Sequence, residues 1–250
     1  MKHDLTHVFQ DWPYDADNTT RIVQAHDGRE VLQVRLPLGL EQYELRGRPD
    51  GARPFGCGSV LEHLESQIVE YRALHGTDVG YELSRSECEM LQDEAILFYY
   101  RYLLLFQRND FERVAQDTEH NLRICKILEQ FCTIVELREP VVQYKPYIVR
   151  LHAMARAMIA MRAHRIAEAA RLIRNAIDHI EAMDDLDSPA FQFERIRSVN
   201  YLKTAIGQLI DTDVDTEDVE LENRLEQAVV REDYELAAEL RDRIRDLRSR

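Results

Sequence analysis

The alternation of apolar and polar residues predicts β-structure in only one stretch of the chain, residues 20–51. Within TRIVQAHDGREVLQVRLPLG, the pair Asp27-Gly28 separates two strand-like runs and is a strong signal for a two-residue hairpin turn at positive φ. LEQYELRGRPDG adds a third strand before a Pro-Asp-Gly turn. The second run has one apolar face, made by Leu32, Val34, Leu36 and Leu38. We therefore expect a three-stranded antiparallel meander with that face covered by helices.

From Ser59 onward the apolar residues recur at helical spacing. The segments SVLE at Ser59 and SECE at Ser86 have the pattern of capping boxes, which mark helix starts. One polar break and three prolines indicate the other boundaries: Asn109-Asp110, Pro140, Pro146 and Ser188-Pro189. The helix that begins at Pro189 is predicted to extend to about Ile210.

These patterns divide the chain into four parts. Residues 1–58 form an N-terminal arm and β-meander packed on the body, and residues 59–210 form an α-helical hairpin body. Residues 211–222, DTDVDTEDVELE, contain seven acids and no basic residue, so we interpret them as a self-repelling linker or a frayed start of the last hairpin. Residues 223–250 form that helical hairpin. The expected fold is mainly α, a helical-hairpin array with a small N-terminal antiparallel β-meander.

Three hairpins share a turn pattern. The segments QRNDFERVAQD, RAHRIAEAARL and VREDYELAAEL align on Phe111, Ile166 and Tyr234, and each bulky residue is followed by small or β-branched residues that let a partner helix approach. The first two segments resemble tetratricopeptide-type units. The three segments are offset from one another by 55 and 68 residues, whereas that repeat has a period of about 34 residues. We therefore interpret the body, residues 59–210, as an irregular helical-hairpin array.

The final segment, LENRLEQAVVREDYELAAELRDRIRDLRSR, resembles the UVR motif of the B and C subunits of the bacterial excinuclease, which also occurs in some Clp-type unfoldases and in activators of protein-arginine kinases. The resemblance runs through both helices and the turn Glu232-Asp233-Tyr234-Glu235. It implies that such hairpins associate antiparallel into a small four-helix bundle. The residues expected to make the protein interaction are Leu225, Ala228, Tyr234, Ala237, Ala238, Arg241, Ile244 and Leu247.

The residue pattern of this hairpin agrees with the resemblance. One apolar stripe contains Leu221, Leu225, Ala228 and Val229, and the facing stripe contains Tyr234, Ala237, Ala238, Ile244 and Leu247. Asp233 is placed to cap the second helix. Helices this short are marginal in isolation, so the hairpin needs a surface to pack on. That surface is a second hairpin or, as the alternative, the body of the same chain.

The charge balance narrows the classes of partner. A net charge of −14 disfavours nucleic acid and anionic membranes, so we expect no meaningful binding to duplex DNA at physiological salt. The chain shows no signal-peptide pattern and no transmembrane-length apolar run, and we expect a cytoplasmic protein.

The four cysteines form no C-x-x-C pair, and Cys125 and Cys132 are too far apart along one helix for a disulfide. Reduced and mostly buried thiols are expected.

The sequence provides no catalytic, cofactor-binding or metal-binding assignment. It contains no G-x-x-x-x-G-K-[ST] loop and no H-E-x-x-H motif, and GRPDGARPFGCG is interpreted as a connecting loop. Trp12 lies in DWPYD between Asp11 and Asp15, where it could grip a peptide or a cation. Docking of an N-terminal arm on the core is the favoured interpretation of this segment.

Three functions are therefore considered. The first is a non-enzymatic adaptor or regulatory protein that binds a protein partner through the C-terminal hairpin, either as a homodimer or with another UVR-bearing protein. The alternative is an accessory factor of nucleotide-excision repair that recruits an excinuclease subunit. The third is an enzyme with a pocket between the β-meander and the helices, for which no nucleophile–base pair or metal set is found.

Overall fold

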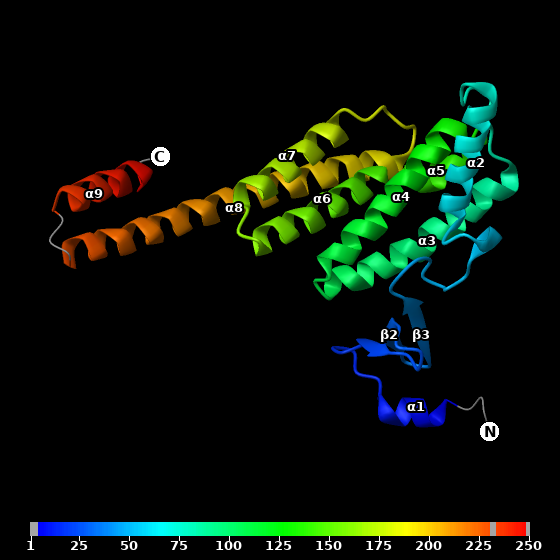
Figure 1. The fold of residues 1–250 in the computed structure, drawn as a ribbon, viewed down its shortest axis with the longest axis horizontal. Helices are drawn as coiled ribbons and strands as arrows, with labels where there is room; N and C mark the ends of the chain where they lie inside the picture. Colours follow the sequence, from blue (N-terminus) through cyan, green and yellow to red (C-terminus); the bar gives the residue numbers. More distant parts are fainter. Residues whose placement is uncertain (1–4, 231–233, 249–250) are drawn as a thin grey trace.

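The computed structural model describes residues 5–230 and 234–248 (Figure 1). The fold is mainly helical with one small N-terminal sheet, as expected. Its elements are α1 (Thr6–Asp11), β1 (Thr20–Gln24), β2 (Glu30–Leu36), β3 (Gly39–Glu44), the 3-10 turn η1 (Pro54–Gly56), α2 (Val60–His75), α3 (Arg85–Gln107), α4 (Phe111–Phe131), α5 (Val135–Val142), α6 (Lys145–Arg162), α7 (Ile166–Glu181), α8 (Pro189–Val230) and α9 (Tyr234–Arg248). Among the described residues, no helix combines the length and apolar character needed to cross a membrane.

The sheet is the expected antiparallel meander, in the order β1-β2-β3. Its two turns differ from the prediction. Ala25 N–H donates to the Arg29 carbonyl at 2.7 Å, and Gly28 alone adopts positive φ, at 81°, which makes a longer loop with a glycine bulge. The tight two-residue turn is the next one, Pro37-Leu38, because Leu36 pairs directly with Gly39.

One face of the sheet packs against the helical body. Leu32 is fully buried in a cluster with Tyr102 and Leu105 of α3, and this cluster joins the sheet to the helical body. The predicted apolar face is wrong at its far end, where Leu36 is 39% exposed and Leu38 is 94% exposed. These two residues lie at the turn into β3.

The N-terminal arm lies on the sheet through two arginines. The guanidinium of Arg21 lies 4.1 Å from the centre of the Trp12 ring, and that of Arg35 lies 4.1 Å from the Phe9 ring. Arg35 also donates from Nε to the Trp12 carbonyl at 2.9 Å. The cation that Trp12 binds is therefore one of this chain's own, which supports docking of the arm.

The helical body is a row of antiparallel hairpins in which α4 packs on α3 and α6, α6 on α7, and α7 on α8 (Figure 1). The α3–α4 and α6–α7 turns share one backbone geometry. Asn109 and His164 take φ of 59° and 57°, and the amide that follows each one donates to a carbonyl five residues back, at 3.0 Å from Asp110 and 2.9 Å from Arg165. The sequence similarity of these two turns thus reflects a shared structure. The third turn, around Asp233, lies outside the described residues.

Two predicted helix boundaries are wrong. The capping box at the start of α3 is formed by Ser84 and Glu87, two residues before the predicted pair, because Ser84 has the extended backbone that an N-cap needs. Pro140 lies inside α5 and begins no helix, whereas Pro146 lies in the first turn of α6, where its missing N–H is tolerated.

Residues 211–222, which were predicted to be a linker or a frayed start of the last hairpin, are helical in the structure, because α8 continues through them to Val230. The acids of this stretch include like-charge pairs at i, i+4 spacing, such as Asp211 with Asp215 and Asp213 with Glu217, and such pairs destabilise a helix. The helix therefore depends on packing at its end. Near the end of the stretch, Leu221 is buried in a small cluster with Leu240 and Ile244 of α9, and this contact stabilises the distal part of the helix.

The buried pair Cys88 and Cys132 yields a redox prediction. Their Sγ atoms lie 3.0 Å apart, between the first turn of α3 and the end of α4, and burial raises the pKa of the Cys88 thiol to about 12. Prolonged exposure to hydrogen peroxide should form a disulfide, with two thiols losing two electrons and two protons as peroxide is reduced to water. Thiol titration in denaturant should fall from four thiols to two, and the cross-link should stabilise the fold by about 3 kcal/mol.

The Cys88→Ser variant should lose this cross-link, whereas the Cys125→Ser variant should keep it. An unchanged count of four reactive thiols after oxidation of the wild type would contradict the prediction.

Candidate functional site

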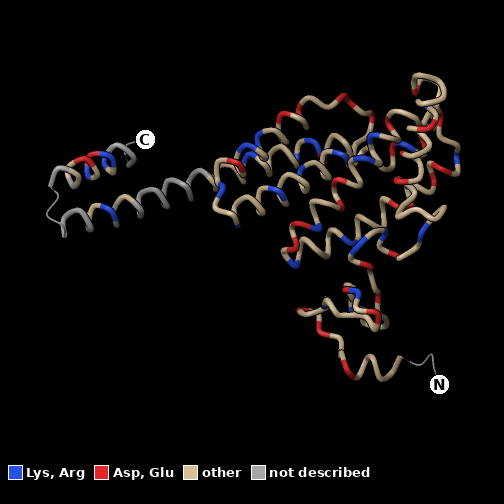
Figure 2. Tube along the Cα trace, viewed as in Figure 1, with Lys and Arg blue, Asp and Glu red and all other residues tan. Residues whose placement is uncertain are grey.

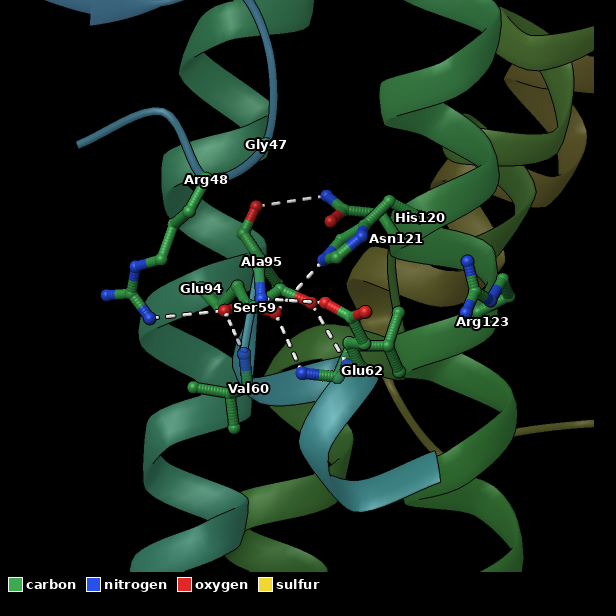
Figure 3. A network of polar contacts seen from close by, with 12 residues as sticks. Gly47, Arg48, Ser59, Val60, Glu62, Glu94, Ala95, His120, Asn121 and Arg123 are labelled. Atoms are coloured by element: carbon green, nitrogen blue, oxygen red, sulfur yellow. Dashed lines mark hydrogen bonds and ion pairs between the residues drawn. The ribbon is translucent and has the colours of Figure 1, made fainter. Parts of the chain in front are cut away.

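The seam between the β-meander and the helices is built around Glu94 of α3, whose side chain is completely buried (Figure 3). Its Oε2 accepts from Val60 N–H at 2.7 Å and from Arg48 Nη1 at 3.1 Å. Its Oε1 accepts from Leu61 N–H at 3.0 Å and lies 3.0 Å from His120 Nε2. A carboxylate at the start of α2 is favourable, because the first amides of a helix have no partner within the helix.

A second buried ion pair, Arg101 with Asp117, closes the same seam. Arg101 Nε and Nη2 donate to the two Asp117 oxygens at 2.8 and 2.5 Å. Its Nη1 donates to the carbonyls of Glu44 and Gly47 at 2.7 and 2.8 Å. These contacts attach the segment after β3 to α3 and α4.

The seam also contains a hollow of about 450 Å³, lined in part by Asp117 and His120. Burial by itself would raise the pKa of Glu94, but the hydrogen bonds from His120 and from the Val60 and Leu61 amides outweigh burial and lower it. Glu94 is therefore ionised at neutral pH and unsuited to act as a general acid. Each of its oxygens already has two partners within the chain. The described residues also include no cluster of three or more potential metal ligands.

The C-terminal hairpin is made by the distal part of α8 and by α9. Three residues form its buried contact: Leu221 at 4% exposure, Leu240 at 5% and Ile244 at 7%, with Leu225 partly buried beside them. Arg245 and Asp242 form an exposed ion pair at 3.2 Å on α9. Figure 1 shows α8 extending beyond the helical body, so the hairpin stands clear of it.

The structure brings together only some of the predicted interaction residues. Leu225 and Ile244 meet at the α8–α9 contact, whereas Ala238 and Arg241 are exposed. Ala238 was expected on the stripe facing α8, and that placement is wrong because residues 238 and 240 lie on nearly opposite sides of α9 and Leu240 occupies the contact. The i, i+4 spacing of Leu221 with Leu225 and of Leu240 with Ile244 could have identified Leu240. The side chains of Ala228, Tyr234, Ala237 and Leu247 lie outside the described residues.

Comparison with known families supplies the decisive observation for this hairpin. Residues 219–250 match the UvrB/uvrC motif, UVR. The match covers the end of α8 and all of α9, residues 219–250, which are here called the UVR hairpin. No family match supports the predicted tetratricopeptide-like character of the helical body. The motif occurs in excinuclease subunits and mediates protein interactions. Neither the curated proteins nor the solved structures provide a match to this chain.

Proposed function

We propose that this protein is a non-enzymatic adaptor or regulatory protein that binds a protein partner through its UVR hairpin, either a second copy of itself or another UVR-bearing protein. The observation that carries the proposal is the position of the hairpin. A motif of protein–protein contact lies at the end of a continuous helix and clear of the body, where a partner can reach it (Figure 1).

The energetics of the hairpin support this role. Its described apolar contact consists of Leu221, Leu225, Leu240 and Ile244. Such a small cluster provides little stability for two solvent-exposed helices, because most helical stability in proteins comes from tertiary packing. A second hairpin packed against it would bury further surface and form a four-helix bundle. In the described part of the chain, α9 packs on α8, which leaves the rest of the body as the less favoured surface for the hairpin.

The seam supports the non-enzymatic part of the proposal. Glu94, Arg101 and Asp117 are the most buried charged groups there, and all three are used to hold the chain together. A buried ionised group near a cleft is often a sign of catalysis, but such structural networks perturb pKa values in the same way.

Self-association is tested by light scattering on the full chain. The wild type should have twice the 29.4 kDa monomer mass. Leu240→Asp should give a monomer, because it places a charge in the α8–α9 contact, and Ala238→Glu should weaken the dimer while leaving that contact intact. Ala182→Glu, an equally exposed change at the end of α7, is the matched control and should remain dimeric.

A monomeric wild type, or one mass for all four proteins, would exclude self-association through the hairpin and leave docking to another UVR-bearing protein as its function.

The second candidate function is recruitment of an excinuclease subunit, and the observation that favours it is the UvrB/uvrC motif itself. Residues 211–250 used as bait should capture an excinuclease subunit if this function is correct. Capture of a protease or kinase partner would instead favour the adaptor function, and a Leu240→Asp bait is the control that should capture neither.

A further inference from the structure

A groove of about 570 Å³ opens on the helical body between α4, α6 and α7. It adjoins the seam hollow at Arg123, which lines both, and none of its lining residues belongs to the UVR hairpin. Its floor is partly apolar, with Leu122, Val149 and Leu172. Its α4 border runs from Glu119 to Glu129, about 15 Å at 1.5 Å per residue. That length matches about four or five residues of an extended peptide at about 3.3 Å each.

The groove is basic in a strongly acidic protein. Four cationic side chains line it against two carboxylates, whereas the whole chain has a net charge of −14. Figure 2 shows Lys and Arg distributed along the helices that form it. Burial lowers the pKa of His152 and of His179, so both imidazoles are neutral at neutral pH and the positive charge comes from the lysines and arginines.

Two of the four cations have no carboxylate partner among the described contacts. Lys145 Nζ lies 2.6 Å from Glu129 Oε2, and Arg123 is paired with Glu65 of α2. Glu119 lies 3.6 Å from His152 Nε2. Lys126 of α4 and Arg156 of α6 form no ion pair in the described part of the chain and border the groove on two sides. The lining thus offers two unpaired cations, Lys126 on one side of a partly apolar floor and Arg156 on the other.

We propose that this groove binds a short acidic peptide segment of a partner protein, with two of its carboxylates paired to Lys126 and Arg156. Charge complementarity favours an acidic occupant, and arginine–carboxylate pairs at a partly desolvated surface add direction as well as energy. The groove is shallow and open to solvent, with exposed cations on its border, which suits a peptide better than a small molecule that needs an enclosed pocket.

Two other occupants fit the observations less well. A nucleic acid would bring its phosphate backbone against Glu119 and Glu129 as well as against the cations, and most of the surrounding protein is acidic. The acidic residues 211–222 of the same chain belong to α8, which continues away from the body as a helix (Figure 1). The occupant therefore comes from another molecule.

The proposal concerns a surface separate from the UVR hairpin, so its test does not depend on self-association. Fluorescein-labelled hexaglutamate is titrated with the full chain, and binding is followed by fluorescence anisotropy at low and high salt. The wild type should bind hexaglutamate and not hexaglutamine, with an affinity that falls as salt is added. The Lys126→Gln/Arg156→Gln variant should bind at least about tenfold more weakly.

The matched control is Arg72→Gln/Arg85→Gln, which removes the same charge from α2 and α3 outside the groove and should bind like the wild type. Equal binding by both double variants, or no hexaglutamate binding by the wild type, would overturn the proposal. Tighter binding of a thymidine dodecamer than of hexaglutamate, lost in the Lys126→Gln/Arg156→Gln variant, would also overturn it and assign the groove to nucleic acid. Thermal melting of each variant verifies that it is folded.

Discussion

Replacing Arg101 with methionine is expected to lower the free energy of unfolding by about 3–5 kcal/mol, the usual loss when one partner of a buried ion pair is removed. The guanidinium of Arg101 makes two hydrogen bonds to Asp117 and one each to the carbonyls of Glu44 and Gly47. Methionine fills a similar length but donates nothing. Asp117, which is 3% exposed, would remain as a buried acid without its partner, and two carbonyls would lose their donor.

Urea denaturation of the full chain measures this loss. Arg101→Met combined with Asp117→Leu should lose less than Arg101→Met alone, because the double variant buries no unpaired charge. Arg85→Met is the control: this arginine is exposed on α3, and its removal should change the free energy of unfolding by no more than about 0.5 kcal/mol. Equal losses in Arg101→Met and in Arg85→Met would show that the seam ion pair contributes nothing to stability.

Replacing Glu94 with glutamine is expected to lower the free energy of unfolding at pH 7 by about 2–4 kcal/mol. The carboxylate accepts from two amides, from Arg48 and from His120. Glutamine keeps the shape of this side chain but turns one of its two acceptor groups into a donor. That donor would face other donors, and Arg48 would lose its buried counter-ion.

The same contacts make the effect depend on pH. Burial would raise the pKa of Glu94, but its hydrogen bonds from His120 and the two amides lower the pKa in the folded state. A carboxyl whose folded pKa is depressed stabilises the fold above its unfolded pKa of about 4.3, and that contribution is lost as pH falls through the folded pKa. The difference in stability between the wild type and Glu94→Gln should therefore be constant from pH 7 to about pH 5 and shrink below about pH 4.

Denaturation curves at a series of pH values measure this difference. Glu89→Gln is the control, since Glu89 lies on the exposed side of the same helix, and its stability difference from the wild type should stay close to zero throughout. If the gap for Glu94→Gln were as large at pH 3.5 as at pH 7, the charge of Glu94 would not be the source of its stabilising effect.

The sequence by itself determined the features that depend on neighbours along the chain. Alternation between residues 20 and 44 predicted the meander, and Asn109-Asp110 predicted the break between α3 and α4. Ser188-Pro189 predicted the start of α8. The UVR hairpin could be predicted from the sequence for the same reason, because its motif is a continuous run of residues. The family match covers residues 219–250.

Only the tertiary structure decided which residues meet across the fold. Glu94 and Arg101 lie on α3, whose apolar periodicity predicts only a buried helix. Glu94 binds Val60, 34 residues away, and Arg101 binds Asp117, 16 residues away. The basic groove likewise combines α4, α6 and α7, so no single segment of sequence contains it. The continuation of α8 through its acids also depends on a distant partner, since Leu221 packs on α9. Local propensity follows from neighbouring residues, whereas burial and ion pairing depend on which elements the folded chain brings together.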